Sequence, residues 1–121
     1  MEDRFGRARI PVAPELVGLL ESRARSKSYA AASYYCQVLI HRAHVVMLVE
    51  RGILSRDEGR AILQGIRAVA ATAKQDERLV SYMATESELI ARIGEVGGKM
   101  HMGRSRNDLA HTQQRMFYRD Q

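Results

Sequence analysis

Apolar residues recur at helical spacing in several segments of the chain, and these segments predict its helices. Residues 13–25 carry a broad apolar face and include Pro14, which suits the first turn of a helix. Residues 29–51 form the longest pattern and are apolar nearly all round, which favours a buried helix. Gly52 suits the position just after that helix, where glycine adopts a left-handed backbone conformation without strain.

Hydroxyl residues followed three positions later by an acidic residue mark further helix starts. Ser55 and Glu58 have the spacing of a capping box, in which each side chain binds a backbone N–H of the other residue. They predict a helix over 56–74. Thr85 and Glu88 have the same spacing and predict the start of a second, shorter helix.

Glycines interrupt the helical pattern before the last helix. The short helix is expected to end near Ile93, and residues 97–108 are expected to form a loop. From Ser105 onward the pattern is helical again. No segment alternates apolar and polar residues over the length of a strand. The sequence therefore predicts one all-α domain of four or five helices over residues 1–121, with residues 1–12 as an irregular arm.

The composition is that of a globular domain with a basic surplus. The 121 residues are 45% hydrophobic and 27% charged. No apolar run reaches the roughly 18 residues of a membrane span, so no membrane association is expected. The 19 basic and 14 acidic residues give a net charge of +5, which favours anionic partners. A nucleic-acid binder is a less favoured interpretation, because none of the five Tyr and two Phe lies in the basic run.

Cysteine and histidine positions restrict the chemistry further. Cys36 is the only cysteine, so it is expected to be a small buried residue in a cytoplasmic protein without a disulfide. His41 and His44 lie in the apolar helix and are expected to pack or to face a partner. His101 either contacts a ligand or packs in its loop. The pattern shows no metal site, and no cofactor is expected.

The run GGKMHMGRSRND, residues 97–108, is the strongest chemical feature of the chain. Glycines let the backbone approach a ligand, and arginine side chains offer planar forks that fit carboxylate or phosphate groups. Ser105 and Asp108 are spaced to open a helix, whose first N–H groups also attract anions. The run predicts a site for an anionic small molecule, and a solvated basic loop is the alternative.

This run resembles the GGKLHTGRSRND signature of the argininosuccinate lyases, members of the fumarase/aspartase superfamily. AHVVMLVERGILSRDE, residues 43–58, and ESELIARIGEVGGK, residues 86–99, resemble the segments that precede the signature. The resemblance covers about residues 30–121 and rests on a long, unusual motif. It implies the N-terminal helical domain of the lyase fold, with the central helical bundle of the family absent from this chain.

The resemblance implies an enzyme of arginine biosynthesis that cleaves argininosuccinate to arginine and fumarate by anti β-elimination of a C–N bond. It places Ser105, Arg106 and Asn107 on the substrate, with Ser26 and Thr85 as weaker candidates. Arg106 can grip a carboxylate in two parallel hydrogen bonds, and Asn107 supplies amide donors. Ser105 either donates to the ligand or caps the helix.

The resemblance also implies that the catalytic groups lie elsewhere. By this resemblance, the base is a serine on a glycine-rich loop far downstream, and the acid is a histidine in a middle segment. Active sites form from three subunits of a homotetramer. The last helical pattern stops at Gln121 without an end signal, as in a piece of a longer chain. We therefore expect no catalytic residue in this chain, and no activity from it alone.

Several positions depart from the family pattern, and they leave the amine half of the substrate open. Gln37 stands in place of an Asp and removes a negative charge that would face a guanidinium group. The other departures are Ile40 and His41 for Gly-Ser, Tyr82 for His, Thr85 for Asn, and Met102 for Thr. Two alternatives follow: a related C–N lyase that acts on another N-substituted aspartate, and a non-catalytic module that keeps the fold.

Overall fold

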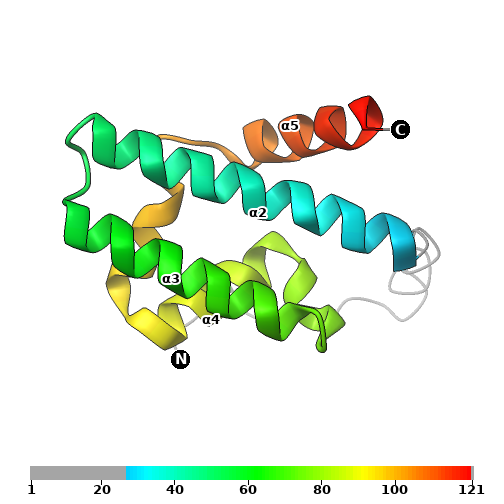
Figure 1. The fold of residues 1–121 in the computed structure, drawn as a ribbon, viewed down its shortest axis with the longest axis horizontal. Helices are drawn as coiled ribbons and strands as arrows, with labels where there is room; N and C mark the ends of the chain where they lie inside the picture. Colours follow the sequence, from blue (N-terminus) through cyan, green and yellow to red (C-terminus); the bar gives the residue numbers. More distant parts are fainter. Residues whose placement is uncertain (1–26, 121) are drawn as a thin grey trace, which may run out of the picture.

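The computed structural model describes residues 27–120, which form helices joined by short turns (Figure 1). In chain order the elements are α2 (Lys27–Glu50), α3 (Arg56–Ala73), η1 (Glu77–Val80), α4 (Tyr82–Ile93), η2 (Glu95–His101) and α5 (Arg106–Arg119), where η1 and η2 are 3-10 helices. No strand occurs among these residues, so the predicted all-α class is confirmed for this part of the chain.

Some predicted features lie outside the described residues. They are the irregular arm over 1–12, the helix over 13–25 and the candidate Ser26. Within residues 27–120, no helix combines the length and the apolar character that crossing a membrane requires.

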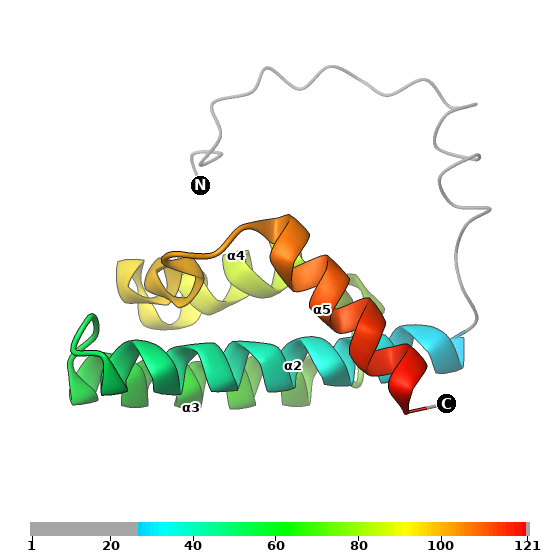
Figure 2. The ribbon, with the colours of Figure 1, turned by 90° about the horizontal axis from the view of Figure 1, so that it is seen from above.

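The long helix α2 lies at the centre of the arrangement. It packs against α3 on one side and against α5 on the other, and Figure 1 shows it between them. Seen from above, α5 crosses α2 obliquely, while α2 and α3 run side by side (Figure 2). The helices α3 and α4 pack together, and η2 contacts both of them. The next helix in the chain, α3, and the last described helix, α5, therefore both pack on α2.

The turn between α2 and α3 is fixed by backbone hydrogen bonds. The N–H of Gly52 donates to the Val49 carbonyl at 3.0 Å, and the N–H of Ile53 donates to the Leu48 carbonyl at 2.9 Å. This pair of bonds is a Schellman motif, and Gly52 has the positive φ of 72° that the motif needs. The predicted role of Gly52 at the end of the long helix is confirmed.

Two of the three predicted capping boxes are present. The Ser55 hydroxyl accepts from the Glu58 N–H at 3.1 Å, and the Ser55 N–H donates to the Glu58 carboxylate at 2.9 Å. Ser105 and Asp108 exchange the same two bonds, each at 3.1 Å. Each box satisfies backbone N–H groups that the first turn of a helix leaves without partners.

The third box is wrong, because the short helix begins earlier. Its N-cap is Ser81, whose hydroxyl accepts from the Ala84 N–H at 3.2 Å, so α4 starts at Tyr82. Thr85 therefore lies inside the helix, where it is 1% exposed. Its hydroxyl donates to the Leu79 carbonyl of η1 at 2.8 Å, which satisfies the group without any cap.

The apolar core lies between α2, α3, α4 and η2. Its fully or almost fully buried members are Val45, Leu48, Leu54, Ile62, Ile66, Val69, Leu89 and Met100. Met100 belongs to the GGKMHMGRSRND run and is 0% exposed, so this run is fastened to the core by one of its own side chains. Burying a methionine of this kind contributes roughly 1.5–3 kcal/mol.

The expectation that the long helix is buried nearly all round is wrong for the described residues. The faces of α2 that meet α3 and α5 are buried, and they include Cys36, as predicted. Another face leaves Tyr35 63%, Val46 44% and Met47 39% exposed. The reason is geometric, since neighbours on two sides of a helix cannot cover its whole circumference.

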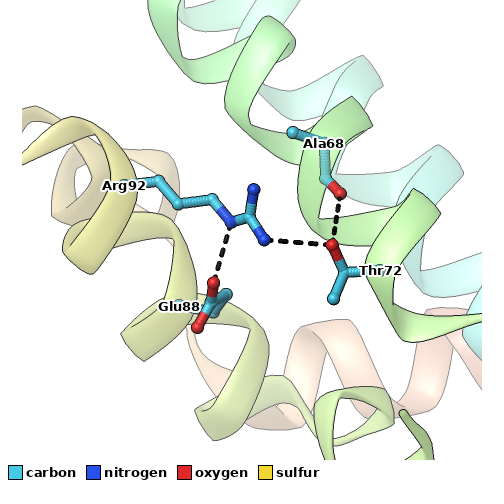
Figure 3. A network of polar contacts seen from close by, with 4 residues as sticks. All are labelled: Ala68, Thr72, Glu88 and Arg92. Carbon is cyan, nitrogen blue, oxygen red and sulfur yellow. Dashed lines mark hydrogen bonds and ion pairs between the residues drawn. The ribbon is translucent and has the colours of Figure 1, made fainter. Parts of the chain in front are cut away.

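A polar contact joins α3 and α4 away from the core (Figure 3). Arg92 of α4 donates through Nε to Glu88 at 2.8 Å and through a terminal nitrogen to the Thr72 hydroxyl at 3.0 Å. The Thr72 hydroxyl in turn donates to the Ala68 carbonyl at 3.2 Å. Because Arg92 and Glu88 are both about one-third exposed, the ion pair orients the two helices more than it stabilises them.

We predict that Gly65→Ala destabilises the domain. A Cβ atom at Gly65 of α3 would overlap the Leu89 side chain of α4 and lie 3.3 Å from Ile93 Cγ2. Leu89 is 0% exposed, so moving its side chain aside would disturb the packed core. Overpacking should cost about 1–3 kcal/mol, more than the gain of up to about 1 kcal/mol in helix propensity.

Denaturant unfolding of the two proteins measures this difference. The exposed neighbour Gln64 provides the control, because Gln64→Ala should change the unfolding free energy by less than about 0.5 kcal/mol. A Gly65→Ala protein as stable as the parent would show that the helices do not approach each other as described.

Candidate functional site

The prediction that residues 97–108 form one loop is wrong. The GGKMHMGRSRND run divides into three parts. Residues 97–101 belong to the 3-10 helix η2, residues 102–105 form a turn, and residues 106–108 make the first turn of α5. We refer to residues 102–105 as the signature turn. This turn connects the side of the molecule that holds η2 and α4 to the helix that crosses α2 (Figure 2).

Lys99 is engaged in a structural contact. Its ammonium group forms an ion pair with one carboxylate oxygen of Glu58, whose other oxygen accepts from the Ser55 N–H. The hydrogen bond from Lys99 holds the pKa of Glu58 below its ordinary value. This basic residue of the predicted anion site therefore fastens η2 to the start of α3.

Arg104 points into the protein. One terminal nitrogen donates to Nδ1 of His41 at 2.9 Å, and Nε donates to Nδ1 of His101 at 3.3 Å. The other terminal nitrogen, NH1, is buried and has no hydrogen-bond partner among the described residues. Burial lowers the pKa of Arg104 relative to a free side chain. The first arginine of the signature is thus part of a half-buried cluster and not an exposed fork.

Three histidines surround this turn, and each one packs. His41 is 0% exposed, and burial together with the positive charge of Arg104 lowers its pKa to about 3. Burial and the same charge lower the pKa of His101. His44 lies 2.8 Å through Nε2 from the Met102 carbonyl and holds the backbone of the turn. The expected packing of His41 and His44 is confirmed for the described structure.

Tyr82 lies between the buried cluster and the exposed end of α5. Its ring centroid is 5.0 Å from that of His101 and 5.8 Å from that of His41. The guanidinium carbon of Arg106 is 5.8 Å from the centre of the Tyr82 ring, within the range of a cation–π contact. Burial and the nearby Glu86 carboxylate raise the pKa of the Tyr82 hydroxyl.

Ser105, Arg106 and Asn107 are all exposed at the N-terminus of α5. The Ser105 oxygen accepts from the Asp108 N–H, so the residue caps the helix, while its hydroxyl hydrogen can still donate to a ligand. The 14-residue helix α5 adds a partial positive charge at this end. The three predicted side chains are therefore together, in a setting that favours an anion.

The other predicted candidates are placed differently. Thr85 is buried and its hydroxyl hydrogen is already donated to Leu79, while Ser26 lies outside the described residues. Met102 is 41% exposed. Among residues 27–120, no group of three or more His, Cys, Asp or Glu side chains is arranged to hold a metal ion.

Sequence reasoning missed the buried pair formed by Gln37 and His41. Gln37 is 3% exposed, and its side-chain amide lies 3.3 Å from Nε2 of His41. Their separation of four residues was a usable signal, because it places two polar side chains on one face of a helix that is otherwise apolar. The partner of His41, Arg104, is 63 residues away in sequence, and no local pattern reveals that contact.

The known proteins to which this chain is similar are lyases. No protein-family model matches the chain. Argininosuccinate lyases of Staphylococcus aureus strains JH9 and Newman are 38% identical over 65% of this chain and 18% of their own length. Structures of an EDDS lyase variant with bound fumarate and of EDDS lyase with formate are each 47% identical to this chain. They match with a TM-score of 0.73 over 89% of this chain and 22% of the solved chain.

These findings confirm the resemblance to the argininosuccinate lyases and to the N-terminal helical part of fumarase/aspartase-superfamily lyases. The chain spans about a fifth of the length of the relatives that it matches.

We predict that Ser105→Ala lowers the stability of the domain by about 1 kcal/mol, because it removes the N-cap of α5. Ser105→Asp should keep the cap and most of the stability. Ser87→Ala, at an exposed position inside α4, is the control and should change the unfolding free energy by less than about 0.5 kcal/mol. Equal denaturant midpoints for Ser105→Ala and the parent would contradict the capping role.

Proposed function

We propose that this chain supplies part of the substrate site of a carbon–nitrogen lyase that releases fumarate. The observation that carries the proposal is the exposure of the consecutive residues Arg106 and Asn107 on the first turn of α5. They belong to the run that resembles the lyase signature. The names of the relatives support the reaction class, because one group is argininosuccinate lyase and a solved EDDS lyase variant holds fumarate.

The proposed chemistry is an anti elimination. A base takes the proton from Cβ of a succinyl group, the electron pair forms the carbon–carbon double bond, and the C–N bond breaks with its pair leaving on nitrogen. Negative charge builds up on the neighbouring carboxylate before the bond breaks. Fixed donors aimed at that carboxylate stabilise the charge. Arg106 would donate two parallel hydrogen bonds, and the Asn107 amide would add another.

In this proposal the chain holds substrate but does not carry out the proton transfers. The base and the acid belong to other segments of the complete protein, which the resemblance implies is a homotetramer. The apolar face of α2, formed by Tyr35, Val46 and Met47, supports such an assembly, because it would be buried by further protein. A cytoplasmic enzyme of arginine biosynthesis is the corresponding cellular role.

The leading substrate is argininosuccinate, and another N-substituted aspartate is the second candidate. Gln37 is the observation that favours the second. It is neutral and buried, so no carboxylate at this position faces the guanidinium group of argininosuccinate. The 47% identity to EDDS lyase also supports this candidate. A non-catalytic module remains the alternative from a different functional class.

We predict that the complete protein releases fumarate from argininosuccinate or from EDDS, and that Arg106→Ala lowers kcat/KM by about 100-fold or more. Fumarate formation is followed by ultraviolet absorbance. Arg115→Ala is the matched control, because Arg115 is an exposed arginine farther along the same helix. Its kcat/KM should stay close to that of the parent. No fumarate from either substrate would refute the proposed function, whereas full activity of Arg106→Ala would refute only the assigned role.

The 121-residue chain by itself is expected to form no fumarate at concentrations where the complete protein is active. The same absorbance assay measures this. Turnover by the isolated chain would contradict the proposal that its acid and base lie elsewhere.

A further inference from the structure

A buried line of polar groups connects α2 to the signature turn. Gln37 and His41 lie one helical turn apart on α2 and are 3% and 0% exposed. The Gln37 amide lies 3.3 Å from Nε2 of His41, and a terminal nitrogen of Arg104 lies 2.9 Å from Nδ1 of the same ring. His41 therefore bridges a neutral amide and a guanidinium group inside the protein.

The hydrogen positions in this line follow from its chemistry. Arginine is always protonated and can only donate, so Nδ1 of His41 must be the acceptor. A neutral imidazole carries its one hydrogen on the other nitrogen, Nε2, which then donates to Gln37. The amide nitrogen of Gln37 is the atom placed 3.3 Å from Nε2 of His41. Because the two ends of a side-chain amide have nearly the same shape, we infer that the amide is turned over, so that its carbonyl oxygen accepts from this N–H.

The surroundings of His41 keep it neutral. Burial and the charges of Arg104, His101 and His44 all act against a proton on the ring and lower its pKa to about 3. The other titratable groups of the cluster, farther from the ring, are Tyr82 and Glu86 on α4 and Arg106 on α5. A neutral residue at position 37 completes this environment, because a carboxylate there would favour the imidazolium form.

The line ends where the substrate-binding residues begin. Arg104 directly precedes Ser105, the N-cap of α5, and Arg106 and Asn107 follow. His44 secures the same segment through the Met102 carbonyl. Farther along the packing contact between α2 and α5, Gln113 of α5 donates to the backbone and hydroxyl oxygens of Ser33 on α2, at 2.7 and 2.8 Å.

Stability alone does not explain a buried histidine paired with a half-buried arginine here. Burying these groups costs solvation free energy, and apolar side chains of similar volume would fill the space at lower cost. The polar groups add a fixed orientation. A hydrogen bond is directional and fixes the guanidinium plane, whereas dispersion contacts do not.

We propose that His41, backed by Gln37, is a positioning residue that fixes Arg104 and thereby aims Arg106 and Asn107 at the anionic substrate. This proposal rests on the proposed function. It assigns to Gln37 and His41, two departures from the family pattern, a joint role behind the site, since both are buried and form one hydrogen-bonded pair.

The hydrogen positions are tested on the 121-residue chain by NMR of ¹⁵N-labelled histidine rings. We expect His41 to carry its hydrogen on Nε2 and to remain neutral down to about pH 4, as its pKa of about 3 requires. The exposed His111 serves as the internal reference for the ring signals. A His41 ring that takes up a proton well above pH 4, or that carries its hydrogen on Nδ1, would overturn the proposal whatever the enzyme does.

The positioning role is tested by kinetics of the complete protein. His41→Leu keeps the volume and removes the acceptor, so kcat should fall about 10- to 100-fold, with a smaller change in KM. His41→Asn offers an amide oxygen to Arg104 and should recover part of the loss. His111→Asn is the control and should leave both constants unchanged. Circular dichroism shows whether His41→Leu folds, and if it does not, His41→Asn and Gln37→Glu decide the question.

Gln37→Glu changes the charge with little change in shape. The new carboxylate would raise the pKa of His41, and the imidazolium would no longer accept from Arg104. The carboxylate would raise the His41 pKa from about 3 to roughly 4–6. The kcat/KM of this variant relative to the parent should therefore fall as the pH is lowered from about 7 to about 5, and recover at high pH. Gln114→Glu adds the same charge at an exposed position of α5 and should show a constant ratio.

The outcomes separate the two proposals. If the parent protein forms fumarate and the His41 and Gln37 variants match it at every pH, the positioning role is refuted and the proposed function stands. If the parent forms no fumarate, the proposed function fails, and the ring NMR still decides whether the hydrogen-bonded line exists.

Discussion

The guanidinium group of Arg104, held between the rings of His41 and His101, is the contact on which the position of the signature turn depends. An arginine in such a place needs acceptors, and two neutral imidazoles provide them without adding a second charge to the cluster. The charge of Arg104 helps to keep both rings neutral by lowering their pKa values. The imidazoles thus supply the acceptors that Arg104 needs, and the charge of Arg104 keeps the imidazoles neutral, as accepting a hydrogen bond requires.

The same segment is fastened at two further points by ordinary packing and pairing. Met100 fills the core, and Lys99 binds Glu58 at the start of α3. Residues that look in sequence like a flexible, basic, glycine-rich loop are therefore mostly committed to structure. What remains exposed is the first turn of α5, which carries Arg106 and Asn107 at the end of the helix where backbone N–H groups favour an anion.

Local chemistry determined which features could be predicted. Capping boxes and a helix-ending glycine depend on neighbours within a few residues, so the roles of Ser55 and Gly52 were predicted correctly. The sequence left Ser105 open between capping and ligand binding, and the structure shows the cap. Thr85 was misassigned because Ser81 caps the helix first and η1 offers a carbonyl to the threonine. The Arg104–His41 contact depends on how α2 and the turn pack together, and sequence periodicity carries no information about that.

A crystal structure of the complete protein with fumarate bound tests the account most directly. We predict a fumarate carboxylate within hydrogen-bond distance of Arg106 and Asn107, with Arg104 still donating to Nδ1 of His41. Fumarate bound away from α5, or Arg104 turned away from His41 to bind the ligand itself, would contradict it.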